Sequence, residues 1–221
     1  MSSALERHPR FVSLEGGEGA GKTTAINAIH ACLRAHGHEV VLTREPGGTP
    51  LAERIRALVL KPDQEIAAEP LSAEAELLLV FAARAQHVRQ VIVPALRRGA
   101  FVLTDRFTDS SYAYQGGGRG LDTQWIAELE RRAVGLLPSL TLLLDVDIDI
   151  GRARANSRDL WPDRIEREQD DFFQRVRATF RERAQQDPRR FALIDAGQAQ
   201  ERVAADVVAR VEHWLQAGEG A

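Results

Sequence analysis

Short apolar runs alternate with longer stretches of helical periodicity along the whole chain. Five runs have the length and composition of buried strands: residues 11–14, 39–43, 101–104, 141–145 and 191–195. Longer stretches between and after these runs repeat their apolar residues every three or four positions, as one face of a helix does. The clearest are residues 73–98, 164–186 and 203–215. This alternation is typical of βα units. We therefore predict an α/β fold with a five-stranded parallel sheet and helices on both of its faces.

One charged side chain, Arg84, falls on the apolar stripe of the helix predicted for residues 73–98, a stripe that consists of Leu77, Val80, Phe81, Val88, Val91, Ile92 and Ala95. A charge at a core-facing position is costly unless it meets an opposite charge. We expect Arg84 to bind the phosphate of a substrate. An internal salt bridge, or a side chain that extends to solvent, is the alternative.

The first strand leads into a glycine-rich stretch that fits the pattern G-x-x-x-x-G-K followed by Ser or Thr. The residues predicted to bind a triphosphate there are Gly16, Gly17, Glu18, Gly19, Ala20, Gly21, Lys22, Thr23 and Thr24. Glycines let consecutive backbone N–H groups point at a phosphate, and the helix that follows adds the positive end of its dipole. Lys22 is expected to reach the β- and γ-phosphates, and Thr23 to bind Mg²⁺. A merely flexible turn is the alternative.

Polar side chains follow the remaining strands, at the edge where parallel sheets bind their ligands. Arg44 and Glu45 follow the second strand and are candidates for substrate binding, although a solvated arginine in a turn is the alternative for Arg44. Asp105 follows the third strand, where an aspartate commonly holds Mg²⁺ through water, and Arg106 beside it would bridge two phosphates. Ala196 follows the fifth strand, where backbone groups can meet an adenine.

Hydroxyl and amide groups follow Arg106 and are suited to hydrogen bonds with a nucleobase and a sugar. Ser111, Tyr114 and Gln115 are the candidates, while packed rings are the alternative for Tyr112 and Tyr114. An arginine-rich segment, residues 152–164, is predicted to close over the triphosphate as a lid. A solvated, charged helix face is the alternative for that segment.

The composition narrows the classes of function. The chain has 221 residues and a formal net charge of −3, which argues against a surface that coats nucleic acid and fits a single domain over residues 1–221. Its one cysteine, Cys32, lies among apolar residues and is expected to be a buried, inert thiol. No apolar run has the length of a signal peptide core or a membrane span, so we expect a soluble, cytoplasmic protein.

Taken together, these motifs resemble those of the thymidylate kinases, bacterial type, within the P-loop nucleoside monophosphate kinase family. The resemblance runs from residue 11 to about residue 215 and rests on residues 15–24, 43–49, 105–107 with 114–120, and 163–166 followed by Phe172 and Phe173. It implies a homodimer that uses ATP and Mg²⁺ to phosphorylate thymidine monophosphate (dTMP). It also implies that Glu18 faces the sugar and that the acceptor phosphate is held by Arg44, Arg84 and Arg106. The lid would supply an arginine that acts in transfer, for which Arg158 is the candidate and Arg154 and Arg164 are the alternatives. The thymine and deoxyribose would lie against Ser111, Tyr114 and Gln115.

One position departs from the family pattern. The family places a phenylalanine that stacks on thymine four residues before the helix arginine, whereas this chain has Val80 there and Phe81 next to it. Either Phe81 enters the pocket, which is our prediction, or the base is held by weaker apolar contacts.

Three other functions compete with a dTMP kinase that gives dTDP and ADP. A kinase for another nucleotide would need a small change in the base pocket. A nucleotide-hydrolysing switch is disfavoured because no Asn-Lys-x-Asp sequence occurs, and an ATP-driven assembly module because no Ser-Gly-Gly-Gln sequence occurs.

Overall fold

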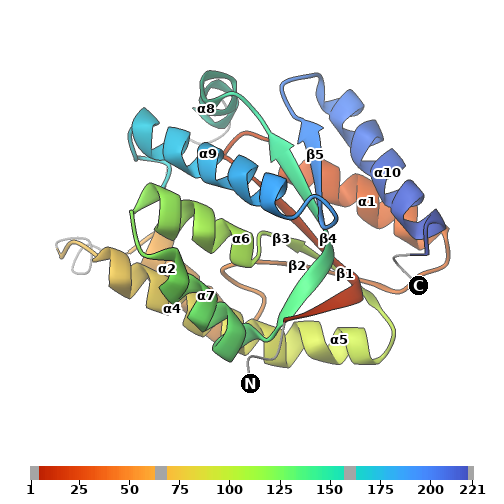
Figure 1. The fold of residues 1–221 in the computed structure, drawn as a ribbon, viewed down its shortest axis with the longest axis horizontal. Coiled ribbons are helices and arrows are strands. Elements are labelled where there is room, and N and C mark those ends of the chain that lie inside the picture. Colours follow the sequence, from red (N-terminus) through yellow and green to blue (C-terminus); the bar gives the residue numbers. More distant parts are fainter. Residues whose placement is uncertain (1–4, 63–68, 157–162, 219–221) are drawn as a thin grey trace.

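The structure is a computed structural model that describes residues 5–62, 69–156 and 163–218. Five parallel strands form one sheet in the order β2-β3-β1-β4-β5 (Figure 1). The strands are β1 (Glu6–Gly16), β2 (Val40–Arg44), β3 (Phe101–Asp105), β4 (Leu136–Asp145) and β5 (Phe191–Asp195). The prediction of a five-stranded parallel sheet is confirmed, and each of the five apolar runs lies in or overlaps one strand.

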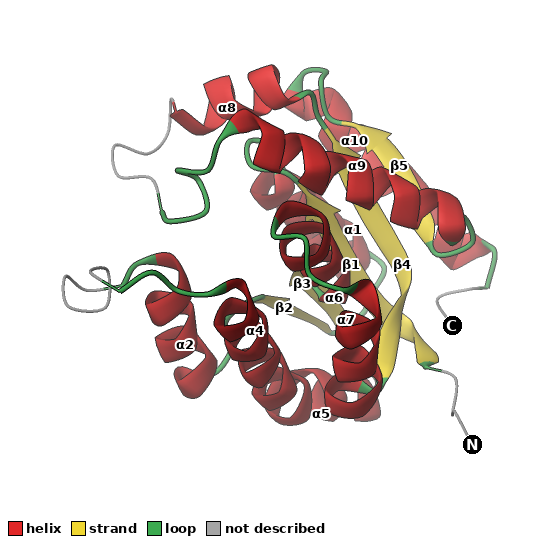
Figure 2. Ribbon diagram, turned by 60° about the vertical axis from the view of Figure 1, so that its left-hand side comes forward, coloured by secondary structure: helices red, strands yellow, loops and turns green. Residues whose placement is uncertain are grey.

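Helices join the strands and cover both faces of the sheet (Figure 2). The α-helices are α1 (Lys22–Ala35), α2 (Pro50–Leu60), α4 (Ala73–His87), α5 (Val93–Arg97), α6 (Thr108–Ser111), α7 (Thr123–Leu129), α8 (Ile148–Asn156), α9 (Asp170–Gln186) and α10 (Gln200–Gln216). In the described part of the chain, π-helical segments continue α4, α6 and α7, namely η1 (Val88–Ile92), η2 (Tyr112–Gly118) and η3 (Glu130–Val134).

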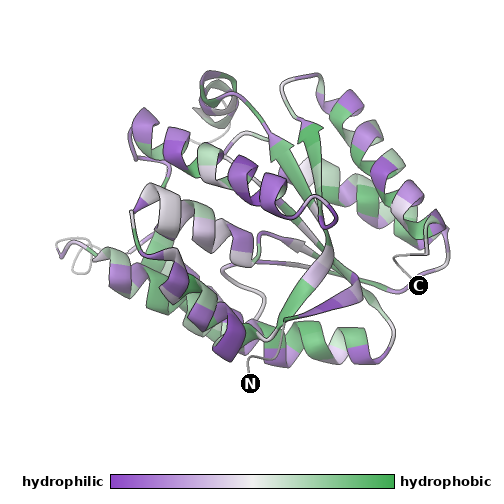
Figure 3. Cartoon of the chain, viewed as in Figure 1, coloured by the Kyte–Doolittle hydropathy of each residue, from purple (hydrophilic) through white to green (hydrophobic). Residues whose placement is uncertain are grey.

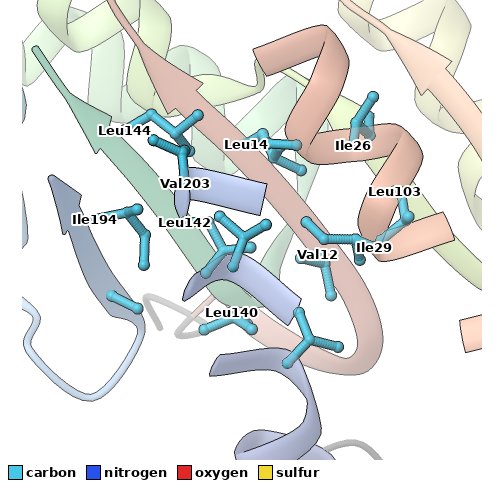
Figure 4. Packing of buried hydrophobic residues seen from close by; sticks show 14 of the residues in the cluster. Val12, Leu14, Ile26, Ile29, Leu103, Leu140, Leu142, Leu144, Ile194 and Val203 are labelled. Carbon is cyan, nitrogen blue, oxygen red and sulfur yellow. The ribbon is translucent and has the colours of Figure 1, made fainter. Parts of the chain in front are cut away.

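Successive side chains of β1 point to opposite faces of the sheet, because side chains alternate in direction along a strand. Val12 and Leu14 pack with Ile26 and Ile29 of α1 and with Val203 of α10 (Figure 4). On the opposite face, the residues of β1 and β3 pack under α4, α5 and α7, where Phe11 meets the ring of Phe107 edge-on at 4.8 Å. The two apolar cores hold β1 in the middle of the sheet, so the loop after β1 starts from a fixed point.

The colouring by hydropathy follows this layering. In Figure 3, β4 and β5 are hydrophobic over much of their length, whereas the helices carry separate hydrophilic and hydrophobic patches. None of the helices within the described residues is sufficiently long and apolar to cross a membrane.

Two helices and one cysteine differ from their predictions. The helix predicted for residues 164–186 begins at Asp170, because Asp163 accepts hydrogen bonds from the N–H groups of Ile165 and Glu166 and holds that stretch in a turn. The helix predicted for residues 73–98 is continuous but passes through the π-helical segment η1. Cys32 is half-buried rather than buried.

A prediction about stability concerns Trp214 of α10, which is 2% exposed and packs edge-on against Phe101 of β3. Trp214→Ala is expected to lower the free energy of unfolding by about 3–5 kcal/mol, because the cavity left in a packed core is only partly refilled. Trp214→Phe should cost clearly less, since the indole N–H has no hydrogen-bond partner among the described residues. Urea unfolding measures both, with Leu193→Ala at an exposed position as the control, expected within about 0.5 kcal/mol of the unchanged chain. Equal losses for Trp214→Ala and Leu193→Ala would contradict this account of the core.

Candidate active site

The loop between β1 and α1 has the backbone geometry of a phosphate cradle. Gly19 and Gly21 have φ angles of 71° and 85°, a region that favours glycine. A Cβ on Gly19 would lie 2.0 Å from the carbonyl oxygen of Gly151, so α8 can approach the loop closely only because Gly19 has no side chain. The tight turn and the close approach of α8 together fix the loop.

The first turn of α1 is open toward this loop. Its N-terminal position, Gly21, provides no side-chain cap, so the first N–H groups of the helix are available to an anion. The Lys22 Nζ donates to the carbonyl oxygens of Gly16, at 3.2 Å, and of Gly17, at 3.0 Å. Burial and the nearby Arg106 guanidinium lower the pKa of the Lys22 ammonium. An anion in the loop would therefore be favoured by both the backbone and the ammonium.

Arg106 is held in an unusual backbone conformation at the end of β3. Its φ of 71° lies in the left-handed region, which is uncommon for a residue with a side chain. Its guanidinium donates to Glu18 Oε1 at 2.5 Å and to the Gly16 carbonyl at 3.0 Å, and it lies over the ring of Tyr114. Burial opposes the ionisation of Glu18, but Arg106 and Lys22 outweigh it and lower the pKa of this carboxyl. Arg106 is thereby fixed against the loop.

A cavity of about 310 Å³ extends from this loop to α2 and α4. Fourteen of the predicted site residues line it: Glu18, Gly19, Ala20, Gly21, Lys22, Thr23, Arg44, Glu45, Arg84, Asp105, Arg106, Ser111, Tyr114 and Gln115. The three arginines expected to hold an acceptor phosphate thus border the same hollow as Lys22.

Arg84 lies at the centre of a buried network at the far end of the cavity. Its Nε donates to Glu45 Oε2 at 2.5 Å, its Nη1 to the Ser111 hydroxyl at 2.9 Å, and its Nη2 to the Phe107 carbonyl at 3.1 Å. The other oxygen of Glu45 lies 2.9 Å from His87 Nδ1. The structure therefore shows the internal salt bridge that was the alternative interpretation, and it also places the guanidinium at the cavity wall, where remaining donors can meet a ligand.

Two cationic side chains that line the cavity, Arg44 and Arg56, lie close enough to repel each other. Arg44 pairs with Glu53 at 2.8 Å, but Arg56 also lines the cavity and donates to the Pro46 carbonyl. Burial, and then the guanidinium groups of Arg44 and Arg106, lower the pKa of Arg56. Such crowding of positive charge would be relieved by a bound anion.

Asp105 provides an unpaired acceptor at the same wall. Its Oδ1 is buried and accepts no hydrogen bond from the described residues. Because a buried carboxylate oxygen without a partner is costly, this atom fits a site for a cation or for an ordered water. Thr23, the other residue predicted to bind a metal, lines the same cavity.

Five predicted residues lie elsewhere. Val80 lines the cavity, whereas Phe81 packs in the core and stacks on the Arg84 guanidinium at 4.6 Å. The expectation that Phe81 borders the base is therefore corrected. Gly16 and Gly17 line a smaller hollow of about 40 Å³ behind the loop. Thr24 is exposed, outside both hollows, and Ala196 is buried at the end of β5.

Arg158 lies outside the described residues, but the two other arginines considered for the lid can be placed. Arg154 of α8 donates to the carbonyl oxygens of Ala196, Gly197 and Gln198, which form the loop predicted to meet an adenine. Arg164 donates to the Val59 carbonyl at 2.9 Å and pairs with Glu76. Both side chains thus tie the predicted lid segment to the elements that surround it.

The comparisons with known proteins agree on one family. A family model for thymidylate kinase matches residues 14–207. The thymidylate kinase of Pseudomonas putida strain GB-1 is 56% identical over 89% of this chain and 92% of its own length, and that of Chromohalobacter salexigens is 53% identical over 93% and 96%. The crystal structure of thymidylate kinase from Ehrlichia chaffeensis matches with a TM-score of 0.71 and 32% identity, over 91% of this chain and 97% of that one. The chain belongs to the thymidylate kinase family.

The candidate site also contains Arg56, Glu76 and His87, which the sequence did not single out. His87 falls three positions after Arg84 on the same helix face, and that spacing is a signal that could have found it. Arg56 and Glu76 carry no such signal, because what places them in the site is the packing of α2 against α4 and of α4 against η2.

Glu15 supports the thymidylate kinase site from inside the sheet. Its carboxyl group is fully buried and accepts hydrogen bonds from the Phe107 N–H at 2.7 Å and from the Ser110 hydroxyl at 2.6 Å. It therefore anchors the turn that carries Arg106. Burial and the neighbouring carboxylate of Asp109 raise the pKa of Glu15 to about 8.

This shift predicts a dependence of stability on pH. A carboxyl whose pKa is raised on folding keeps its proton in the native state and loses it on unfolding, so rising pH favours unfolding. Between the ordinary value of 4.5 and about 8, Glu15 should lower the free energy of unfolding by up to about 1.4 kcal/mol per pH unit. Glu15→Gln cannot release this proton and should give a flatter curve in urea unfolding from about pH 5 to about pH 8. Parallel curves for the two proteins would show that Glu15 is ionised in the folded state.

Proposed function

We propose that this chain transfers the γ-phosphoryl group of ATP to dTMP, yielding ADP and dTDP. The observation that carries the proposal is the single cavity that joins the phosphate loop to Arg44 and Arg84. One end offers backbone N–H groups and Lys22 to a triphosphate, and the other offers guanidinium groups to the phosphate of an acceptor. Membership of the thymidylate kinase family names the two nucleotides.

Arg106 supports the transfer itself. It borders the loop at Gly16 and also the cavity beyond, so one guanidinium can face the donor and the acceptor phosphates together. Phosphoryl transfer needs positioning and the neutralisation of charge more than covalent help from the protein. The side chains assigned to these tasks are Lys22, Arg106 and, from the lid segment, Arg158. A phosphate acceptor is already ionised, so no general base is assigned, and Glu18 is proposed to orient Arg106 and the sugar.

We assign Mg²⁺ to Thr23 and, through water, to Asp105. The unpaired Oδ1 of Asp105 fits such a role. No cluster of three or more His, Cys, Asp or Glu side chains able to hold a metal occurs in the described part of the chain, which suits an ion that takes its other ligands from phosphate oxygens and water. When bound, Mg²⁺ would neutralise charge on the β- and γ-phosphates.

The remaining assignments concern the bases and the assembly. The backbone at Ala196, whose carbonyl oxygen accepts a hydrogen bond from Arg154, is proposed to meet the adenine. The side chains proposed to meet the deoxyribose and thymine are Ser111, Tyr114 and Gln115.

A homodimer is proposed because α2 and α4 expose three leucines, Leu51, Leu58 and Leu78, on helices that pack together. Sedimentation of the purified chain tests the dimer. Location in the cytoplasm stays a prediction of the sequence.

The activity is tested by a coupled assay of ADP release, with and without each nucleoside monophosphate. Strong stimulation by dTMP is expected, and chelation of divalent cations should abolish it. ADP release that is indifferent to every acceptor would favour a hydrolysing switch or an assembly module. Stimulation by a different monophosphate alone would assign another base to the pocket.

A second prediction concerns Arg44, which is proposed to hold the phosphate of the acceptor. Arg44→Met should raise KM for dTMP about tenfold or more, because a hydrogen bond to a charged group contributes about 1.5–3 kcal/mol. The melting temperature should change little, since Arg44 and its partner Glu53 are both about half exposed. Arg98→Met, which breaks an equally exposed pair with Glu39, is the matched control and should leave KM unchanged. An unchanged KM in Arg44→Met would remove Arg44 from the acceptor site.

A further inference from the structure

The carboxylate of Glu76 is buried at the wall of the cavity, on the first turn of α4. Its Oε1 accepts a hydrogen bond from Gln115 Nε2 at 2.7 Å. Its Oε2 accepts from Arg119 Nε at 3.2 Å and also pairs with Arg164. None of the work assigned above to the phosphates uses this carboxylate.

The two arginines determine how Glu76 can act on Gln115. A carboxylate that pairs with two guanidinium groups is ionised, and an ionised carboxylate only accepts hydrogen bonds. Arg119 is itself held by Glu168 at 2.6 Å and by the ring of Phe172, so the arrangement around Oε2 is fixed. Oε1 is then left as a rigid acceptor that faces the amide of Gln115.

An acceptor at this place fixes the orientation of the Gln115 amide. The amide has one donor end and one acceptor end, and the two orientations have nearly the same shape. Because Glu76 can only accept, the NH₂ group of Gln115 must face Glu76. The Oε1 of Gln115 is then available to a ligand in the cavity, which the Gln115 side chain lines. Within the described residues this oxygen accepts no hydrogen bond. The cavity therefore presents an acceptor at this point.

We propose that Glu76 is a specificity-determining residue, which positions Gln115 so that its oxygen reads a donor on the acceptor base. The inference rests on the proposed function, in which Gln115 lies beside the base. Thymine and uracil carry a hydrogen on N3, whereas N3 of cytosine is an acceptor. Two acceptors that face each other in a buried site leave both without a partner, and such a mismatch discriminates strongly between ligands. Glu76 thus selects N3–H pyrimidines.

The substitution Glu76→Gln tests this assignment. The new amide should turn its oxygen to Arg119 and Arg164 and its NH₂ to Gln115, which must then reverse and present its own NH₂ to the base. The kcat/KM values for dTMP, dUMP and dCMP are measured. The preference for dTMP over dCMP is expected to fall about tenfold or more, and dUMP should fall in parallel with dTMP, because the two bases share N3–H.

Glu130→Gln is the matched control. Glu130 is another buried carboxylate that accepts a hydrogen bond from a buried side chain, the Tyr112 hydroxyl at 2.9 Å, but it does not line the cavity. Its substitution should leave the ranking of the three nucleotides unchanged. Glu76→Asp keeps an acceptor and should also keep the ranking, at a lower rate.

The outcomes separate this inference from the proposed function. Equal losses for all three nucleotides in Glu76→Gln, or an unchanged ratio of dTMP to dCMP, would overturn the role of Glu76 in specificity. A wild-type chain that ignores dTMP would instead overturn the proposed function. If thermal melting shows that Glu76→Gln does not fold, the wild-type chain is assayed with dTMP methylated at N3. Use of that nucleotide as readily as dTMP would overturn the inference, and rejection would support it.

Discussion

The site depends on holding several cationic side chains close together around one cavity. The cavity is bordered by Lys22, Arg44, Arg56, Arg84 and Arg106. Burial, and then the repulsion of neighbouring guanidinium groups, lower the pKa values of Lys22 and Arg56. Folding must place these groups before any ligand compensates them. The repulsion between these cationic side chains therefore favours the binding of an anion and also lowers the stability of the folded chain.

Carboxylates make this arrangement possible. Glu45 holds Arg84, Glu18 holds Arg106 and Glu53 holds Arg44, each through at least one oxygen at hydrogen-bond distance. Each pair reduces the repulsion and also fixes the direction in which the remaining guanidinium donors point. Donors that are already oriented lose little entropy when a phosphate arrives, which is how preorganised sites gain both affinity and rate.

The sequence predicted the features that depend on local pattern. The alternating apolar runs predicted the sheet, and the glycine motif predicted the phosphate loop. The ends of the predicted strands indicated that Arg44 and Asp105 lie at one edge of the sheet, where both line the cavity. It could not predict features that depend on packing between distant elements, such as the contact of Glu76 with Gln115. Val80 and Phe81 show the same limit, because neighbours on a helix differ by about 100° in direction and only the docking of α4 decides which faces the cavity.

Two side chains that line the cavity are held in the same way. A buried carboxylate fixes the orientation of each side chain that is proposed to meet a ligand group: Glu45 orients Arg84, and Glu76 orients Gln115. Beside Arg84 the carboxylate leaves donors free, and beside Gln115 it leaves an acceptor free. The difference arises because a guanidinium has only donors, whereas an amide has both kinds of group. A buried carboxylate can therefore serve affinity where it holds a guanidinium and selectivity where it holds an amide.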